Sequence, residues 1–579
     1  MGSGADDRII SRASKWLEGN FDEETKKLVK DMMENDLQGL TEAFHTDLEF
    51  GTGGLRGIMG AGTNRMNKYT VGMATQGLAN YIKAAVAGAP AGIAIAYDSR
   101  NNSRFFAQVT ADVMSANDIK VFLFSELRPT PELSFAIRHL GCVSGIVITA
   151  SHNPKEYNGY KVYWSDGGQL VSPQDKNVIA EVRKISSINE VCFEAKPELI
   201  EMIDADVDEA YLKNVMSLSL NPQLIQKHHE LKIVYTPIHG SGITLVPQAL
   251  KCMGFDDVHV LQAQAVPDGN FPTVKSPNPE EPSALALAIQ KANETGASLV
   301  LATDPDADRV GVAVKNNKGE FILLNGNQTA SILTAYLLGQ WKEKGLLRGK
   351  EFIVKTIVTS ELLKDIATHY NVESFDVLTG FKYIAEIIQK LEGEKVFIGG
   401  GEESYGFLVG DFVRDKDAVI ACCMIAEAAA YALEKGLSLF DMLQQIYVDF
   451  GFYYEGLLSL TKKGISGTEE IAKMMAGYRT QPPHEINNRA VVRIMDYKLQ
   501  KETDVKTGLQ KDIKLPVSDV LQFFLDDGSK ITVRPSGTEP KIKFYFGIKG
   551  VLENASQFEE TETLLKQKIS DLIVAMKLQ

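Results

Sequence analysis

The run Gly92-Ile-Ala-Ile-Ala-Tyr97, followed by the polar turn Asp98-Ser-Arg-Asn-Asn102, decides the fold class of this chain. The run is apolar and predicts a buried strand, and an amphipathic helix is expected near residues 103–116. A second apolar run, residues 120–124, follows that helix. A strand, a helix and a second strand in this order are typical of a mixed or parallel sheet flanked by helices.

The same plan occurs two more times along the chain. Its strand, helix and strand segments are expected at residues 232–235, 243–253 and 258–261, and again at 352–358, 360–370 and 374–378. Three tandem, related α/β domains with mixed sheets are therefore predicted. From about residue 450 short alternating segments precede a helix near 557–576, which predicts a smaller C-terminal α+β domain around a shared central cleft.

The length of 579 residues agrees with about four domains, at ~150 residues for each. We predict an N-terminal helical extension at 1–45, domain 1 at 46–205, domain 2 at 206–325, domain 3 at 326–450, and a linker with domain 4 at 451–579. The polar segment 465–516, rich in Lys, Gln and Pro, is expected to be mostly linker.

The composition excludes several classes of function. A net charge of −14 argues against a nucleic-acid partner, although a locally basic cleft could still hold a small anion. No secretion signal and no apolar stretch of membrane-spanning length is visible, so no membrane partner is expected. The five cysteines are scattered without a CxxC pair, which indicates reduced thiols in a cytoplasmic protein. We expect a monomer or dimer.

The loop Thr149-Ala-Ser-His-Asn-Pro154 follows the apolar run 142–148. A serine at the end of a buried strand, in a turn closed by proline, is displayed on a rigid support, which suits a nucleophile. Acyl transfer with His152 as base is one possibility, but chain neighbours seldom face each other correctly.

The loop Asp304-Pro-Asp-Ala-Asp308-Arg309 lies between two apolar runs, 298–302 and 310–314. Three carboxylates at alternate positions can converge on one hard cation, Mg²⁺, Ca²⁺ or Mn²⁺. Arg309 would balance part of their charge and could polarise a phosphoryl oxygen. The alternative to a metal-binding loop is an acidic surface turn. The flanking apolar runs, which predict buried strands, argue against that alternative.

Three further loops carry polar side chains that suit a sugar phosphate, although each could also be an ordinary turn. Glu402 and Ser404 in the loop 399–406 suit sugar hydroxyls, and Arg56 in the glycine-rich loop 50–57 could reach a phosphate. The loop 534–540 has the composition of a phosphate cradle, through Arg534, Ser536, Gly537 and Thr538. Together with the serine and the acidic loop, these indicate phosphoryl transfer through a phosphoserine.

These loops have the order and spacing of the α-D-phosphohexomutase superfamily, which the chain resembles over essentially its whole length, most of all in the phosphoglucomutase branch. The resemblance implies interconversion of hexose 1-phosphate and hexose 6-phosphate, glucose above all. Ser151 would carry the phosphate, and glucose 1,6-bisphosphate would be the intermediate and activator. The implied Mg²⁺ ligands are Ser151, through its phosphate, Asp304, Asp306 and Asp308.

The resemblance also implies residue roles. Lys161 matches the general acid/base, with His152 as a second candidate, and its pKa is expected to be lowered by Mg²⁺ and Arg309. Glu402 and Ser404 match the readers of the sugar hydroxyls, and the loop 534–540 matches the phosphate site.

The segment Thr379-Gly-Phe-Lys382 and residue Glu403 depart from the usual phosphomannomutase pattern and favour the glucose branch. Lys382 is expected to contact substrate, and Lys355 is a weaker candidate of the same kind. A phosphopentomutase or phosphomannomutase on the same machinery stays open, as do a Mg²⁺-dependent sugar phosphatase and a non-catalytic sugar-phosphate sensor.

Overall fold

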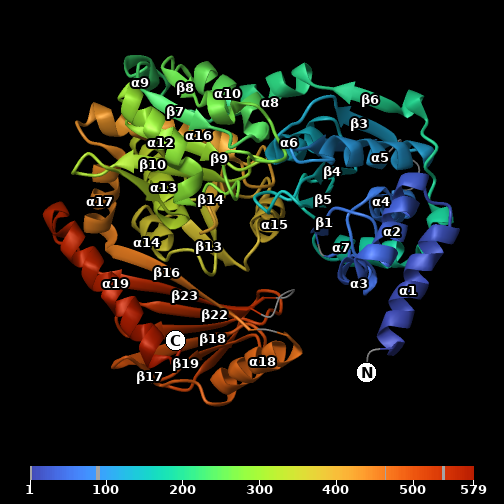
Figure 1. The fold of residues 1–579 in the computed structure, drawn as a ribbon. Helices are drawn as coiled ribbons and strands as arrows, with labels where there is room; N and C mark the ends of the chain where they lie inside the picture. The colour runs from blue at the N-terminus through green and yellow to red at the C-terminus, as the bar shows by residue number, and fades with distance from the viewer. Residues whose placement is uncertain (1–2, 52, 87–91, 463, 537–540, 579) are drawn as a thin grey trace.

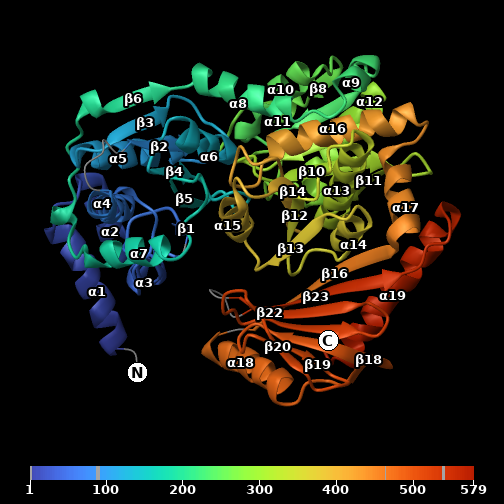
Figure 2. The same ribbon diagram turned by 180° about the vertical axis from the view of Figure 1, so that it is seen from behind.

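The computed structural model describes residues 3–51, 53–86, 92–462, 464–536 and 541–578. Figures 1 and 2 show domain 1 beside the paired domains 2 and 3, with the C-terminal sheet below domain 3. Three helix-flanked mixed sheets and a separate C-terminal sheet confirm the predicted fold class.

The N-terminal helices pack on domain 1. They are α1 (Ser3–Glu18), α2 (Glu23–Asn35) and α3 (Leu37–Phe44). The Trp16 ring lies 5.5 Å from the Phe44 ring and 5.7 Å from that of Tyr69, between ring centroids. Tyr69 belongs to the first helix of domain 1, so this aromatic cluster joins the extension to the domain.

Domain 1 has a six-stranded sheet of order β1-β5-β4-β2-β3-β6. Its strands are β1 (Gly54–Ile58), β2 (Gly92–Tyr97), β3 (Lys120–Phe124), β4 (Ser144–Ile148), β5 (Tyr157–Trp164) and β6 (Ile200–Ile203). Its helices are α4 (Lys68–Ala85), α5 (Ser103–Ala116), α6 (Thr130–His139) and α7 (Gln174–Lys184). All six residues of β2 are buried, because parallel partners flank the strand and helices cover the sheet.

Domain 2 has a five-stranded sheet of order β11-β10-β9-β7-β8. Its strands are β7 (Ile233–Thr236), β8 (Val258–Val260), β9 (Leu299–Thr303), β10 (Val310–Lys315) and β11 (Phe321–Leu324). Its helices, with the connection from domain 1, are α8 (Ala205–Ser217), α9 (Pro222–Lys227), α10 (Val246–Met253), α11 (Gln262–Ala265) and α12 (Pro282–Thr295).

Domain 3 has a four-stranded sheet of order β13-β12-β14-β15. Its strands are β12 (Glu351–Thr356), β13 (Glu373–Val377), β14 (Val396–Gly401) and β15 (Phe407–Val409). Its helices are α13 (Gly326–Glu343), α14 (Leu362–His369), α15 (Phe381–Leu391), α16 (Ala418–Glu434) and α17 (Leu439–Phe450). The three predicted loops at 149–154, 304–309 and 402–406 each follow the carboxyl end of a strand, β4, β9 and β14, where α/β sheets usually bind ligands.

Domain 4 is a single sheet of order β16-β23-β22-β21-β18-β19-β20, with β17 paired to β18. Its strands are β16 (Phe452–Thr461), β17 (Glu485–Ile486), β18 (Arg489–Asp496), β19 (Lys501–Asp504), β20 (Gln510–Asp512), β21 (Leu521–Leu525), β22 (Lys530–Pro535) and β23 (Lys541–Gly550). Its helices are α18 (Gly464–Thr480) and α19 (Phe558–Ala575).

The expectation that 465–516 is mostly linker is wrong, because this segment supplies α18 and four strands of domain 4. The strand β20 is exposed at each of its three residues, so its composition is polar although it is paired. The predicted domain limits stay predictions. No helix in the described part of the chain is both long and apolar enough to cross a membrane.

Candidate active site

Ser151 faces the aspartate loop of another domain. Its Oγ donates a hydrogen bond of 2.6 Å to Asp304 Oδ2 and lies 3.1 Å from His152 Nδ1. The backbone of Ser151 is in the left-handed region, with φ of 50°, which costs a non-glycine residue about 1–2 kcal/mol. The surrounding contacts must therefore hold the serine in this position.

Asp98 and Arg100 provide that support from the turn after β2. Arg100 donates to the carbonyl oxygens of Ser151 at 2.6 Å and Pro154 at 2.9 Å, and Asp98 accepts from Thr149 Oγ1 at 2.6 Å. Sequence reasoning did not assign a role to either residue, although both lie in the polar turn that it identified.

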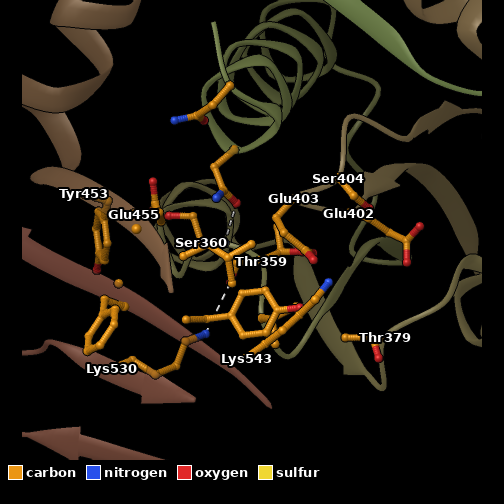
Figure 3. A pocket seen from close by; sticks show the side chains of 18 of the residues that line it. Thr359, Ser360, Thr379, Glu402, Glu403, Ser404, Tyr453, Glu455, Lys530 and Lys543 are labelled. Atoms are coloured by element: carbon orange, nitrogen blue, oxygen red, sulfur yellow. Dashed lines mark hydrogen bonds between the residues drawn. The ribbon is translucent and has the colours of Figure 1, made fainter. Parts of the chain in front are cut away.

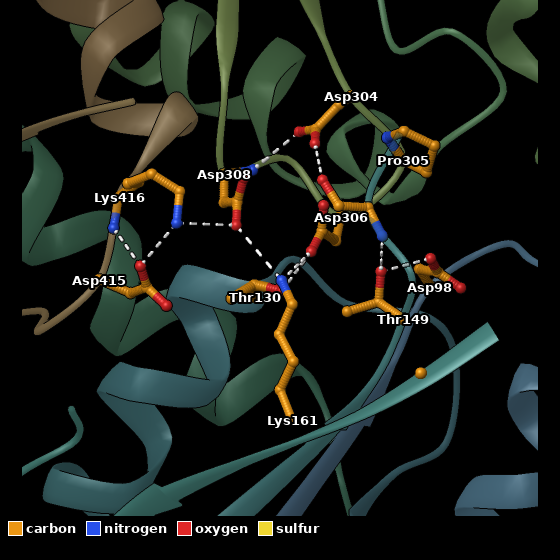
Figure 4. Close-up of polar contacts among 12 residues, drawn as sticks. Asp98, Thr130, Thr149, Lys161, Asp304, Pro305, Asp306, Asp308, Asp415 and Lys416 are labelled. Atoms are coloured by element: carbon orange, nitrogen blue, oxygen red, sulfur yellow. Dashed lines mark hydrogen bonds and ion pairs between the residues drawn. The ribbon is translucent and has the colours of Figure 1, made fainter. Parts of the chain in front are cut away.

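The three aspartates of the loop between β9 and β10 converge (Figure 4). Asp304, Asp306 and Asp308 are buried, and one ligand atom from each lies within 4.8 Å of the others. One oxygen of Asp306 and one of Asp308 are buried without a hydrogen-bond partner among the described residues. Unpartnered buried carboxylate oxygens in such a cluster fit a hard divalent cation such as Mg²⁺.

The charges of the cluster are unequally balanced. Burial, with Asp306 and Asp308 close by, raises the pKa of Asp304 well above its ordinary value. Burial also acts to raise the pKa of Asp306, but the Lys161 ammonium outweighs it and holds that pKa low. At neutral pH the cluster therefore has its firmest negative charge at Asp306, beside Lys161.

Lys161 bridges two of the aspartates. Its Nζ lies 2.7 Å from Asp306 Oδ2 and 3.4 Å from Asp308 Oδ2 (Figure 4). Burial acts to lower the pKa of Lys161, but the two carboxylates outweigh burial and the pKa is raised. The lowered pKa that the sequence analysis expects of Lys161 beside Mg²⁺ stays a prediction. A divalent cation on the same carboxylates would weaken their attraction for the ammonium.

His152 differs from Lys161, because its pKa is lowered. Burial, then the charges of Arg309 and Arg56, lowers its pKa to about 3, so its imidazole is neutral at neutral pH. Arg309 pairs with Glu280 at 2.7 Å, and Arg56 Nη1 donates to Asn153 Oδ1 at 3.4 Å. Both predicted arginines therefore lie around the serine loop.

Lys416 is a cation of the site that sequence reasoning missed. Its Nζ lies 3.1 Å from Asp308 Oδ2 and 2.9 Å from Asp415 Oδ1, and Tyr163 of domain 1 donates to Asp415 at 2.6 Å. The signal was the alternating charge of residues 414–417, a short distance after β15. Domain 3 therefore supplies a second ammonium to the aspartate cluster.

The loop 402–406, which is predicted to bind the sugar and is called the sugar loop below, joins β14 to β15. It contacts the loop 304–309, which is called the metal loop below. Val310 N donates to Tyr405 O at 3.1 Å, with Tyr405 at φ 65°, and Ala307 of the metal loop has φ 51°. Glu402 Oε1 accepts from Gly380 N at 2.8 Å. Burial raises the pKa of Glu402 above its ordinary value.

A cavity of about 540 Å³ brings these loops together (Figure 3). Residues from four predicted loops and from other parts of domains 3 and 4 line it, including His152, Arg309, Thr379, Glu402, Ser404, Lys530, Arg534 and Lys543. A cavity of this size can hold a sugar phosphate.

The two other predicted lysines differ in their surroundings. Lys355 is buried and its ammonium pairs with Glu361 at 2.9 Å and Asp376 at 2.8 Å, which favours the structural alternative for this residue. Lys382 Nζ lies 5.3 Å from the centroid of the Tyr383 ring, and burial lowers its pKa.

The predicted phosphate loop of domain 4 is described in part. Arg534 lies opposite Lys543 in the β22–β23 ladder, and Ser536 N donates to Lys541 O at 2.7 Å. Gly537 and Thr538 lie outside the described residues. The described part of the loop thus combines a guanidinium with neighbouring lysines, as a phosphate site requires.

Models of the four domains of one family match this chain. They are the α/β/α domains I, II and III and the C-terminal domain of phosphoglucomutase/phosphomannomutase, and they match residues 47–189, 209–319, 325–450 and 487–561.

Curated relatives agree with this match. A phosphoglucomutase of Staphylococcus epidermidis is 38% identical over 554 residues, 95% of this chain and 98% of that protein. One of Staphylococcus aureus is 40% identical over 511 residues, 88% and 91% of the two chains.

Solved structures share the fold. Parafusin, a phosphoglucomutase from Paramecium in an open form, has a TM-score of 0.69 at 18% identity, over 92% of this chain and 95% of that one. A protein from Thermus thermophilus described as a putative phosphomannomutase has a TM-score of 0.65 at 20% identity, over 89% of this chain and 99% of that one.

Proposed function

The chain belongs to the phosphoglucomutase/phosphomannomutase family, and on that premise we propose that it interconverts glucose 1-phosphate and glucose 6-phosphate through a phosphoserine at Ser151. The observation that carries this proposal is the 2.6 Å contact between Ser151 Oγ of domain 1 and Asp304 of domain 2. It sets a displayed hydroxyl against a buried acidic cluster, which suits phosphoryl transfer better than acyl transfer.

Asp304, Asp306 and Asp308, with a phosphate oxygen on Ser151, would hold Mg²⁺, which supplies neutralisation of phosphoryl charge when bound. In the forward step the P–O bond to Ser151 breaks and a P–O bond to a sugar hydroxyl forms. The hydroxyl loses a proton and Ser151 Oγ gains one. Lys161, on the same carboxylates, is the proposed proton carrier, and the neutral His152 is the secondary candidate.

The remaining residues serve the substrate. Glu402 and Ser404, which line the cavity, would read sugar hydroxyls. Arg309 would polarise a phosphoryl oxygen during transfer. Arg56 and Lys382 would contact the phosphosugar. Arg534, Ser536, Gly537 and Thr538 would hold the phosphate that is not reacting. Glucose 1,6-bisphosphate would be the intermediate that turns over in the cavity and the activator that restores the phosphoserine. A cytoplasmic location and a monomer or dimer stay predictions.

Initial rates on glucose 1-phosphate, mannose 1-phosphate and ribose 1-phosphate, with and without glucose 1,6-bisphosphate, test the proposal. Glucose 1-phosphate is expected to be the fastest, and no activity on it would overturn the proposed substrate. Inorganic phosphate released in step with turnover would instead indicate a sugar phosphatase. Binding without turnover would indicate a sensor.

A further inference from the structure

The side chain of Lys530 of domain 4 contacts a group of oxygen acceptors on domain 3, which we call the socket. The socket consists of the carbonyl oxygens of Ile357 and Thr359 and the carboxylate of Glu361. Lys530 Nζ donates to Ile357 O at 2.9 Å, to Thr359 O at 3.2 Å and to Glu361 Oε1 at 2.6 Å. Figure 3 shows the side chain reaching from the sheet of domain 4 toward Thr359. An ammonium has three N–H donors, so all of them have acceptors on the other domain. The side chain is only 6% exposed, so this charge is held by the socket and not by water.

The socket is built by domain 3 without help from domain 4. Glu361 is also paired with Lys355 at 2.9 Å, and Ser360 N donates to Asn327 Oδ1 of α13 at 2.9 Å. Because these contacts lie within domain 3, the carbonyls and the carboxylate keep their positions when domain 4 moves. The socket is therefore a fixed point on the cleft wall.

A second contact and an apolar cluster surround the ammonium. Gln522 Nε2 of β21 donates to the same Ile357 O at 2.7 Å, and its Oε1 accepts from Tyr497 OH at 2.7 Å. Side chains of both domains form the apolar cluster, namely Ile357, Val358, Leu378, Tyr497, Ile513, Val520 and Tyr545. This cluster shields one side of the socket, whereas Lys530, Thr359 and Glu361 also line the cavity.

The socket is close to the phosphate loop. Lys530 and Arg534 belong to one strand, β22, and are four residues apart, so they share a face at a separation of about 13 Å. An ammonium on a flexible stem has rotatable donors and tolerates rotation in its socket better than a planar guanidinium does. A small rotation of domain 4 about Lys530 would thus shift Arg534 while the two domains stay attached.

The chain also allows such a rotation. Domain 3 passes into domain 4 at Gly451, which has φ of 101° between α17 and β16, a backbone conformation that favours glycine. Tyr453, Glu455 and Gly528 line the part of the cavity near this connection, so empty space adjoins it.

We propose that Lys530 is the pivot of domain 4, a positioning residue that keeps Arg534 and Ser536 aimed at the sugar loop while the domain turns. This inference rests on the proposed mutase function, because a bisphosphate that reorients in the cavity needs a phosphate site that loosens and re-engages. A domain 4 without its pivot would grip the substrate weakly and lose the bisphosphate to solvent more often. The transfer step at Ser151 would be little affected.

Lys530→Met tests this, because methionine keeps the bulk and Glu361 retains Lys355. We expect KM for glucose 1-phosphate to rise about tenfold, the size of a lost charge-assisted hydrogen bond, with kcat changed little. The concentration of glucose 1,6-bisphosphate needed for half activation is expected to rise similarly. Phosphorylation of Ser151 by saturating bisphosphate should stay at the wild-type rate.

The matched control is Lys318→Met. Lys318 of domain 2 also pairs with a residue across a domain boundary, Glu559 of domain 4 at 2.7 Å, but its side chain is 61% exposed. This variant should have the wild-type KM for glucose 1-phosphate and should need the wild-type concentration of glucose 1,6-bisphosphate for half activation. Equal kinetics in the two variants, or a loss of kcat alone in Lys530→Met, would overturn the pivot.

Two further measurements keep the inference falsifiable. If Lys530→Met does not fold, Gln522→Leu should give the same rise in KM with kcat preserved, and a wild-type KM there would overturn the pivot. Small-angle X-ray scattering should give a larger radius of gyration for Lys530→Met than for Lys318→Met, a readout independent of activity. A wild-type protein without mutase activity would overturn the proposed function, whereas unchanged scattering and KM would overturn the pivot alone.

Discussion

Three domains send charged side chains to the serine centre, whereas domain 4 meets domain 3 through the buried ammonium of Lys530 and ion pairs nearer the surface. At the centre Lys161 of domain 1 and Lys416 of domain 3 both contact the aspartates of domain 2, at 2.7 and 3.1 Å. At the lower joint one lysine occupies a preformed socket. The difference separates chemistry, which needs fixed distances, from substrate grip, which needs movement.

A further set of ion pairs, which we call the clamp, holds domain 1 to domain 3. Arg138 of α6 and Arg414 after the sugar loop both pair with Glu392, each at 2.9 Å. Both guanidinium groups also donate to the carbonyl oxygen of Asp411. Two cations on one carboxylate and one carbonyl tie the serine domain to the sugar-loop domain.

The largest expected effect is at the serine centre. Ser151→Ala removes the phosphate carrier, and mutase activity should fall by at least about 10³-fold because no other group can take its role. Intact mass should show one phosphate increment in the wild-type protein and none in the variant. Unchanged turnover in a folded Ser151→Ala protein would contradict the phosphoserine route.

The next effect is at the metal loop. Asp306→Asn removes one proposed ligand and the partner of Lys161, so activity should fall by about 10²-fold and half activation should require more Mg²⁺. A Mg²⁺ titration of the initial rate measures both. Asp256→Asn, at an exposed acid paired with His229, is the control and should leave the titration unchanged. An unaltered Mg²⁺ requirement in Asp306→Asn would refute the ligand assignment.

A smaller effect is expected at the clamp, and it should be of the opposite kind to that at Lys530. Arg138→Met loosens the joint between domains 1 and 3, so kcat should fall by up to about tenfold while KM for glucose 1-phosphate changes little. Steady-state kinetics on this variant and on Lys530→Met test the comparison directly. The same KM-dominated pattern in both variants would remove the distinction between a fixed centre and a movable grip.

The smallest effect concerns stability at the lower joint. Burial raises the pKa of Glu455 to about 7, against an ordinary value of 4.5. The folded state then binds more protons than the unfolded state between these values, so the stabilisation is complete below pH 4.5 and is lost as the pH rises through 7.

Glu455→Gln should remove that pH dependence. It should raise the free energy of unfolding at pH 8 by about 1 kcal/mol, a figure reduced from the full shift because the side chain is partly exposed. Melting temperatures at pH 5.5 and 8 measure this, with the exposed Glu560→Gln as control. Equal pH slopes in wild type and Glu455→Gln would exclude Glu455 as the source.

Much of the fold could be predicted from local pattern. The run 92–97 and the helix at 103–116 match β2 and α5, because continuous burial and helical periodicity both leave a signal in sequence. The segment 465–516 was missed because β18–β20 form an edge of the sheet with many exposed side chains, so their composition resembles a linker.

The site could be predicted where its residues are adjacent in the chain. The three aspartates are separated by single residues, and their convergence is confirmed. Lys416, Arg100 and Lys530 were missed because each acts on a partner far away in sequence, such as Asp308 for Lys416. The roles of Lys416 and Lys530 depend on how different domains meet, and that of Arg100 depends on how two loops of domain 1 meet. No local pattern records either arrangement.

The left-handed backbone of Ser151, Ala307 and Tyr405 has a consequence for the evolution of this chain. Glycine at any of these positions would relieve about 1 kcal/mol of conformational strain. At Ser151, however, the same change would also remove the hydrogen bond to Asp304, so the strained backbone and the reactive hydroxyl are retained together.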